Sequence, residues 1–145
     1  MTRYIKIDEN NIPTNVFNDS SRYLFDGTEI YLDDNWDSTI YNGKEIFNEY
    51  EVAQFTWDPT EKILIERNQS EIDNDPSFIT YYKKLKKEEL NKYVGDNLLD
   101  VIKPGIRSLE DIVTAWNSFK TNASSWTTKQ QVDNAFDTSI NWLNS

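Results

Sequence analysis

The sequence contains neither histidine nor cysteine. Without cysteine the chain can form no disulfide and no thiolate zinc site. The absence of histidine removes the commonest general base, the usual nitrogen ligand of metals, and every nucleophile that depends on a neighbouring imidazole. An enzyme built from this chain would have to use carboxylates, lysine or tyrosine. We therefore expect a protein without catalytic activity.

Glycine is also scarce, with 4 residues at positions 27, 43, 95 and 105. Because they never cluster, the chain has neither a phosphate-binding P-loop nor the dinucleotide-binding fingerprint, and we predict no cofactor. No apolar run approaches the ~20 residues that a membrane-spanning helix needs. The first residues lead directly into a strand pattern, which predicts synthesis in the cytoplasm without a signal peptide.

Basic residues are outnumbered, and the net charge is −10. Residues 1–75 carry 17 acidic and 6 basic side chains, whereas residues 76–145 carry 8 and 9. An acidic surface repels phosphate backbones, so we expect no nucleic-acid partner. The acidic half indicates either solubility or a docking face for a protein with a basic surface. The 5 Trp, 8 Tyr and 7 Phe suffice for a folded core and leave aromatics for a contact surface.

The clearest local structure lies in residues 51–67. Two β-prone runs, residues 52–57 and 63–67, flank the segment Asp58-Pro59-Thr60-Glu61-Lys62. Asp is favoured at the first position of a type I turn, and Pro sets φ at the second. The sequence therefore predicts a β-hairpin here.

Further strands are predicted before this hairpin, at residues 3–8, 12–17, 22–25 and 29–32. The last two are expected to form a hairpin around Asp26-Gly27, since both residues tolerate positive φ. Residues 40–51 fit two alternatives. They form either one or two amphipathic helical turns or a hairpin that turns at residues 41–44.

After Asp75 the pattern becomes helical. Asp75 as N-cap and Pro76 at the first helical position predict a helix to about Val94, and Asp96 can cap a shorter one through Lys103. Two further helices are predicted, one from a capping box at residues 108–111 and one capped by Thr127 or Thr128. Their apolar stripes are Leu109, Ile112, Val113, Trp116 and Phe119 in the first, and Val132, Ala135, Phe136, Ile140 and Leu143 in the second.

The predicted fold class is α+β: N-terminal antiparallel β-hairpins in a small sheet, followed by three to four helices, the last two an antiparallel pair. An acidic, aromatic-rich β region (residues 1–74) precedes a helical region (residues 75–145), and we expect the two to form one structural domain. The helix pair is expected to pack on the sheet, with Trp57 and Ile65 facing Trp116 and Phe136. The alternative is that the pair docks on another protein.

An acidic loop at residues 33–37 partly matches a calcium-binding loop. Asp33, Asn35 and Asp37 stand where an EF-hand has its first three ligands. Ser38 stands where the motif needs glycine, and Lys44 where it needs the bidentate glutamate. We therefore predict a solvated loop and no metal.

The same loop contains Trp36. This tryptophan is either part of the core or an aromatic anchor inside an acidic rim, which is the form expected of a protein-binding hot spot. In the second case the predicted protein-binding residues are Asp33, Asp34, Trp36, Asp37 and Tyr41.

The opening strand Tyr4-Ile5-Lys6-Ile7-Asp8-Glu9-Asn10, followed by Ile12-Pro13, resembles the start of some tail-fibre-associated and tail-assembly proteins of tailed bacteriophages. The β-rich front and the helical, tryptophan-containing tail are also similar to theirs. The specific resemblance covers residues 1–17. It implies a virion component or an assembly factor that works by binding, with no catalytic residues to carry over.

We therefore expect a non-enzymatic protein-interaction subunit, either a phage virion or tail component or a tail assembly factor, whose partners are other protein subunits. The alternative is an acidic inhibitor or immunity-type protein that masks a basic site on a toxin or nuclease, with its charge steering association. A carboxylate-dependent enzyme is the third hypothesis, for which no spacing singles out a pair of acids.

Overall fold

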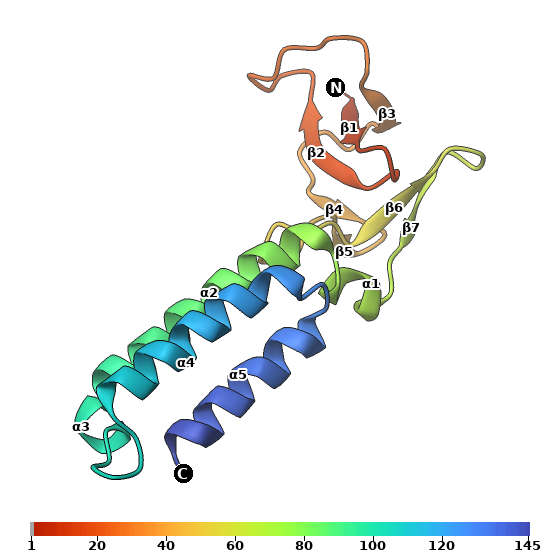
Figure 1. The fold of residues 1–145 in the computed structure, drawn as a ribbon. Coiled ribbons are helices and arrows are strands. Elements are labelled where there is room, and N and C mark those ends of the chain that lie inside the picture. The colour runs from red at the N-terminus through yellow and green to blue at the C-terminus, as the bar shows by residue number, and fades with distance from the viewer. Residues whose placement is uncertain (1) are drawn as a thin grey trace. The chain divides into compact units, whose positions relative to one another are not determined.

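The computed structural model describes residues 2–145, which divide into two compact units (Figure 1). The strand unit ends at Ile72, and the helical unit begins at Asp73. Antiparallel strands therefore precede helices, as in the predicted α+β class. The division lies close to the predicted change after Asn74. That the two units form one structural domain stays a prediction.

The strand unit is built around β1 (Arg3–Ile7), the central strand of an antiparallel sheet with the order β2-β1-β3. Its neighbours are β2 (Pro13–Asn18) and β3 (Ile30–Asp33). Since side chains alternate along a strand, the sheet has two different faces. Ile5 lies on the face that is packed into the core, and Tyr4, whose partners are Phe17 and Tyr31, lies on the other.

The hairpin predicted in residues 51–67 is confirmed, because β6 (Phe55–Asp58) pairs with β7 (Ile63–Glu66). The Asp58 carboxylate accepts hydrogen bonds from the backbone N–H groups of Thr60 (2.8 Å) and Glu61 (3.1 Å), which fixes the turn. For residues 40–51 the hairpin alternative is correct: β4 (Ile40–Tyr41) pairs with β5 (Lys44–Glu45) across Asn42-Gly43. Both turn residues have positive φ, 49° and 80°.

The hairpin predicted around Asp26-Gly27 is wrong. Residues 22–25 form no strand, and β3 pairs with β1 instead. The segment folds onto the outer face of the sheet, where Tyr23 stacks on Phe17 at a centroid distance of 4.1 Å and Phe25 meets the same ring edge-on at 5.2 Å. These aromatic contacts outweigh the local turn preference.

The helical unit contains α2 (Pro76–Asp96), α3 (Leu98–Val101), α4 (Leu109–Asn122), the 3-10 helix η1 (Ala123–Ser125) and α5 (Lys129–Leu143), and the short α1 (Gln69–Asp73) lies at the division. The predicted caps of the three long helices are confirmed at Asp75, Ser108 and Thr128. The short helix differs from the prediction, because it begins after Asn97 and ends at Val101.

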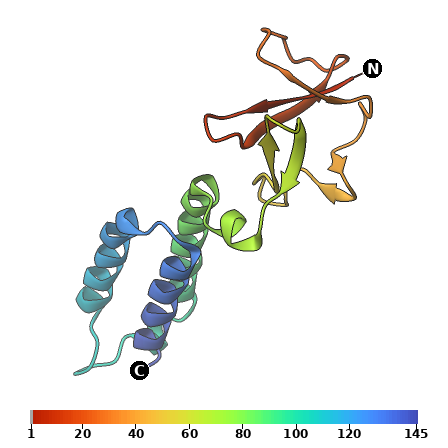
Figure 2. The same ribbon diagram turned by 90° about the vertical axis from the view of Figure 1, so that its right-hand side faces the viewer.

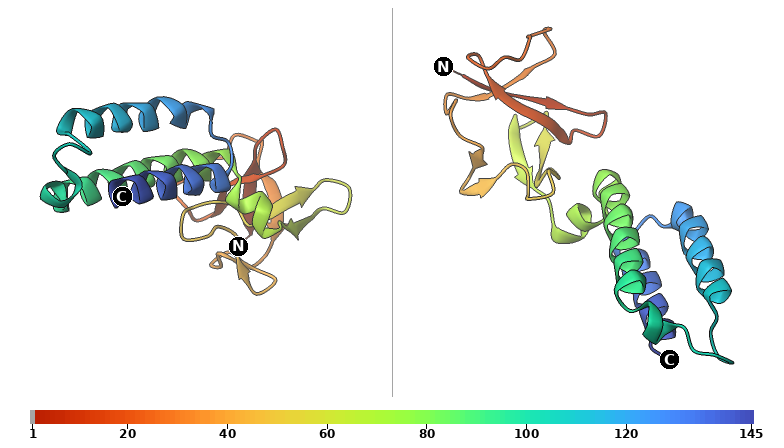
Figure 3. Two further views of the ribbon diagram at one scale, coloured as in Figure 1. Left: turned by 60° about the horizontal axis from the view of Figure 1, so that its bottom comes forward. Right: turned by 90° about the vertical axis from the view of Figure 1, so that its left-hand side faces the viewer.

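The three long helices form a bundle in which α2 and α5 run in the same direction side by side, and α4 runs opposite to both (Figures 2 and 3). Polar side chains join α2 to α5, since the Tyr82 hydroxyl donates to Asp133 and the Tyr93 hydroxyl donates to Asn144. Helix α4 contributes apolar side chains to the shared cluster. The predicted antiparallel pair of α4 and α5 is thus present, with α2 as a third member.

Each unit has its own hydrophobic cluster. The first consists of Ile5, Ile46, Phe55, Trp57 and Leu64, and the second of Leu90, Val101, Ile112, Phe119 and Leu143, with Trp116 and Phe136 packed against it. Trp57 is buried in the first cluster, and Ile65 is 49% exposed. That Trp57 and Ile65 face the helical stripe stays a prediction. Within the helical unit the helices pack their apolar stripes against one another, and Leu90 of α2 is part of the shared cluster.

Candidate functional site

Residues 33–41, here called the Trp36 loop, are held by one buried arginine. Arg3 on β1 is 2% exposed, and its guanidinium donates to both carboxylate oxygens of Asp33, at 2.9 and 2.5 Å. The same group donates to the backbone oxygens of Ser38 at 2.9 Å and Ile40 at 2.7 Å. Bidentate, charge-assisted bonds of this kind fix geometry as well as adding energy. Both ends of the loop are therefore fastened to β1.

Asp33 has a structural role in this arrangement. Burial by itself would raise the pKa of Asp33, but hydrogen bonds from Arg3 and from the backbone amide of Asn35, together with the arginine charge, hold the pKa below its usual value. Its oxygens are thus already engaged by donors. Within residues 2–145, no group of three or more acidic side chains is placed to hold a metal ion.

Asp33 also makes the stability of the strand unit depend on pH. Because its pKa is lowered by folding, its contribution is present above the unfolded pKa of about 3.9 and is lost as pH falls through the folded value. We expect the urea concentration at the unfolding midpoint of the strand unit to decrease as the pH is lowered from about 5 to about 3. In Asp33→Asn this midpoint is expected to depend less steeply on pH. Urea titrations monitored by tryptophan fluorescence measure this, with Asp37→Asn as the control in the same loop. An unchanged slope in Asp33→Asn contradicts the assignment.

Trp36 is 40% exposed, so it is not a core residue of the strand unit. Its backbone oxygen accepts a hydrogen bond from the Asn18 side chain at 2.8 Å, which ties the middle of the loop to the end of β2. Asp34 and Asp37, on either side of it in the sequence, are also exposed. The loop thus presents a partly exposed indole and two exposed carboxylates on a backbone held by hydrogen bonds. That these residues bind a protein stays a prediction.

Tyr41, the fifth predicted site residue, belongs to the packing of the strand unit. Its hydroxyl accepts a hydrogen bond from the backbone N–H of Leu64 at 3.3 Å, and its ring meets Phe55 edge-on with centroids 5.4 Å apart. These contacts join the β4–β5 hairpin to the β6–β7 hairpin. The structure therefore separates Tyr41 and Asp33, which hold the loop, from the exposed Asp34, Trp36 and Asp37.

Sequence reasoning missed Tyr31, which is 52% exposed. Partial burial raises the pKa of Tyr31, and the negative charge of the Asp34 carboxylate raises it further, so the two groups are close enough to interact. Tyr31 therefore adds an aromatic surface next to the Trp36 loop. The alternation of Ile30, Tyr31 and Leu32 along a strand was the signal that could have placed it on the outer face.

The strand unit has too few basic side chains to neutralise its acidic ones. Residues 1–72 carry 15 acidic and 6 basic side chains. Four of the basic groups are already used in ion pairs, namely Arg3–Asp33, Lys6–Asp26, Lys44–Glu66 and Arg67–Glu71. The excess of carboxylates gives this unit a negative potential that attracts basic partners.

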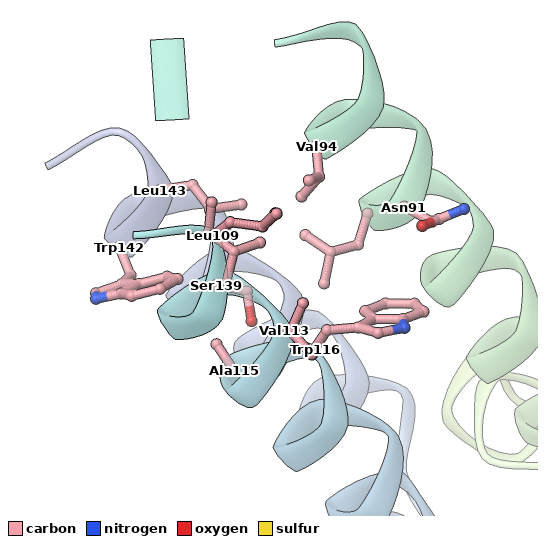
Figure 4. A pocket seen from close by; sticks show the side chains of 11 residues that line it. Asn91, Val94, Leu109, Val113, Ala115, Trp116, Ser139, Trp142 and Leu143 are labelled. Carbon is pink, nitrogen blue, oxygen red and sulfur yellow. The ribbon is translucent and has the colours of Figure 1, made fainter. Parts of the chain in front are cut away.

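The helical unit contains a concave feature that the sequence did not indicate. A pocket of about 170 Å³ lies between α2, α4 and α5 (Figure 4). Its lining residues are Leu90, Asn91, Val94, Leu109, Ile112, Val113, Ala115, Trp116, Ser139, Trp142 and Leu143. A pocket of this kind depends on how closely three helices approach one another, which helical periodicity does not specify.

These features define a class: an α+β protein with an acidic strand unit that presents an anchored aromatic loop, and a nearly neutral helical unit with an apolar pocket. Comparison with known proteins assigns no family to the chain, since no family model, curated protein or solved structure matches it. Among the helices of residues 2–145, none is long and apolar enough to cross a membrane. Function is therefore argued from the geometry of the two surfaces.

Proposed function

We propose that this chain is a non-enzymatic protein-interaction subunit whose Trp36 loop binds a basic surface of another protein. The observation that carries the proposal is the partly exposed Trp36 on a loop that the buried Arg3 fastens at both ends. Tryptophan is enriched among binding hot spots, and a loop that is already ordered loses little entropy on binding. Asp34 and Asp37 supply the charge that selects a basic partner.

Photo-crosslinking tests the loop directly. We expect benzoylphenylalanine in place of Trp36 to give a discrete covalent adduct with one protein in the producing cell, because the partner would cover this side chain. The matched control carries the same group in place of Tyr50, an exposed aromatic of the same unit. Mass spectrometry identifies the adduct. No adduct at position 36, or equal adducts at both positions, contradicts the proposal.

The resemblance of the opening strand to phage tail-associated proteins extends the proposal to a class of partner. The bound protein is then another subunit of a bacteriophage tail or of a tail-assembly intermediate. Mass spectrometry of purified particles, or co-purification with tail components, is expected to find this chain. Purification alone as an inert monomer contradicts this extension.

The uncompensated carboxylates of residues 1–72 favour a second function, that of an acidic inhibitor or immunity-type protein masking a basic site on a toxin or nuclease. Charge-steered association slows steeply as salt is added, because exposed charges are screened beyond about 8 Å at physiological ionic strength. A steep fall of the association rate constant with salt supports this function, and a salt-insensitive rate contradicts it.

A further inference from the structure

The pocket between α2, α4 and α5 has no part in the function proposed for the Trp36 loop. We infer that it is a binding site for a small, neutral, apolar molecule about the size of one aromatic ring. Apolar side chains from all three long helices converge on it, including Leu90 of α2, Ile112 of α4 and Leu143 of α5. In Figure 4 the indole rings of Trp116 and Trp142 lie on opposite sides of the pocket.

The lining selects a neutral ligand. None of the eleven lining residues is Asp, Glu, Lys or Arg. A charged molecule entering the pocket would lose hydration without gaining an ionic partner among the lining residues, which is costly. An apolar molecule has no such penalty and gains from removing its surface and that of the pocket from water.

The two polar lining residues offer little to a ligand or to water. The Ser139 hydroxyl donates to the backbone oxygen of Ala135 at 2.9 Å, one turn earlier in α5. Figure 4 shows the amide of Asn91 directed away from the pocket. Water is held in a cavity by two to four polar partners, so this lining favours an apolar occupant over ordered water.

The volume limits the size of that occupant. An apolar cavity of roughly 150 Å³ stays dry and binds benzene, and the pocket here measures about 170 Å³. It therefore has room for one ring or a branched aliphatic group of similar size. Leu109 and Val113, which line it, are 55% and 49% exposed, so a ligand can enter from solvent without unfolding of the bundle.

Helix α4 is the wall that can adjust to a ligand. Hydrogen bonds of Tyr82 with Asp133 and of Tyr93 with Asn144 join α2 to α5, whereas α4 meets them through apolar side chains. Arg107, just before the N-cap of α4, donates to the backbone oxygens of Trp142 and Leu143, so the start of α4 is tied to the end of α5. Apolar contacts are non-directional, so the rest of α4 can shift slightly while these bonds are kept.

Fluorine NMR of the full chain labelled with 5-fluorotryptophan tests the site, with toluene and indole as probes. Two of the 5 tryptophans, Trp116 and Trp142, line the pocket, and Trp57 lies in the other cluster. We expect saturable shifts of the Trp116 and Trp142 resonances, with a dissociation constant of about 1 mM or tighter, and no shift of Trp57. Benzoate, a charged ring of similar size, is expected to bind at least tenfold more weakly. Absence of a saturable shift, shifts of all resonances alike, or equal binding of benzoate overturns the inference.

A pair of variants on α4 locates the site. Ala115→Leu fills the pocket and is expected to weaken toluene binding at least tenfold, whereas Thr114→Leu, an exposed neighbour outside the lining, leaves it unchanged. Ser139→Leu fills the same space from α5. It replaces Ala115→Leu in the test if circular dichroism shows that Ala115→Leu is not helical. Wild-type affinity in a folded filling variant overturns the assignment.

Discussion

Replacing Arg107 by methionine is expected to lower the free energy of unfolding of the helical unit by about 3 kcal/mol or more. Arg107 is 2% exposed, and its guanidinium donates to the backbone oxygens of Val101 (2.6 Å), Trp142 (2.5 Å) and Leu143 (2.7 Å). The last two lie at the end of α5, where carbonyl groups have no donor within the helix and where a cation complements the helix dipole. Methionine keeps an apolar stem but removes the guanidinium donor from all three oxygens. The Trp142 oxygen keeps its bonds from Ser145, so the cost of roughly 1–3 kcal/mol for each acceptor that stays buried applies to the oxygens of Val101 and Leu143.

Urea unfolding followed by far-ultraviolet circular dichroism measures this change, because the long helices all belong to the helical unit. Lys84→Met is the matched control, since Lys84 is an exposed cation on α2. Substitutions at such surface positions usually change stability by no more than about 0.5 kcal/mol. A loss below about 1 kcal/mol in Arg107→Met would show that the arginine does not hold the end of α5.

Replacing Arg3 by methionine is expected to destabilise the strand unit by about 2–4 kcal/mol and to loosen the Trp36 loop. The substitution removes the partner of the partly buried Asp33 carboxylate and the donor to the Ser38 and Ile40 backbone oxygens. The loop then keeps its local bonds, such as that from the Ser38 amide to the Asn35 oxygen at 3.1 Å, and the bond from Asn18 to the Trp36 oxygen. It loses the side-chain bonds that join Asp33, Ser38 and Ile40 to β1.

Hydrogen exchange with mass spectrometry separates the two effects. Under native conditions residues 33–41 are expected to exchange faster in Arg3→Met, with a smaller change in the β6–β7 hairpin, whose turn is closed by its own Asp58. Arg22→Met, at an exposed position, serves as the control. Equal exchange of residues 33–41 in wild type and Arg3→Met would contradict the role assigned to Arg3.

Local sequence signals predicted local structure well. The turn at Asp58-Pro59, the cap at Asp75 and the capping box at Ser108 each depend on residues within a few positions of one another, and the structure has all three. The hairpin expected around Asp26-Gly27 failed because aromatic contacts with β1 and β2 compete with the turn.

The long-range contacts could not be predicted in this way. Arg3 reaches residues 30 to 37 positions away, and Arg107 reaches the end of α5 from 35 or more positions away. A periodic pattern records which side chains face inward but not which buried polar group meets which partner. The same limit applies to the site: the sequence indicated a tryptophan in an acidic loop but could not show that Asp33 and Tyr41 are used to hold it.

The affinity of Trp36→Ala for the partner captured by crosslinking tests the central claim most directly. Isothermal titration calorimetry of wild type, Trp36→Ala and Tyr50→Ala measures it, with circular dichroism as a check that each variant is folded. As a hot-spot residue, Trp36 is expected to contribute at least about 2 kcal/mol, so Trp36→Ala should bind about thirtyfold more weakly, whereas Tyr50→Ala stays close to wild type. Equal affinities of Trp36→Ala and wild type would contradict the proposal that this loop is the binding surface.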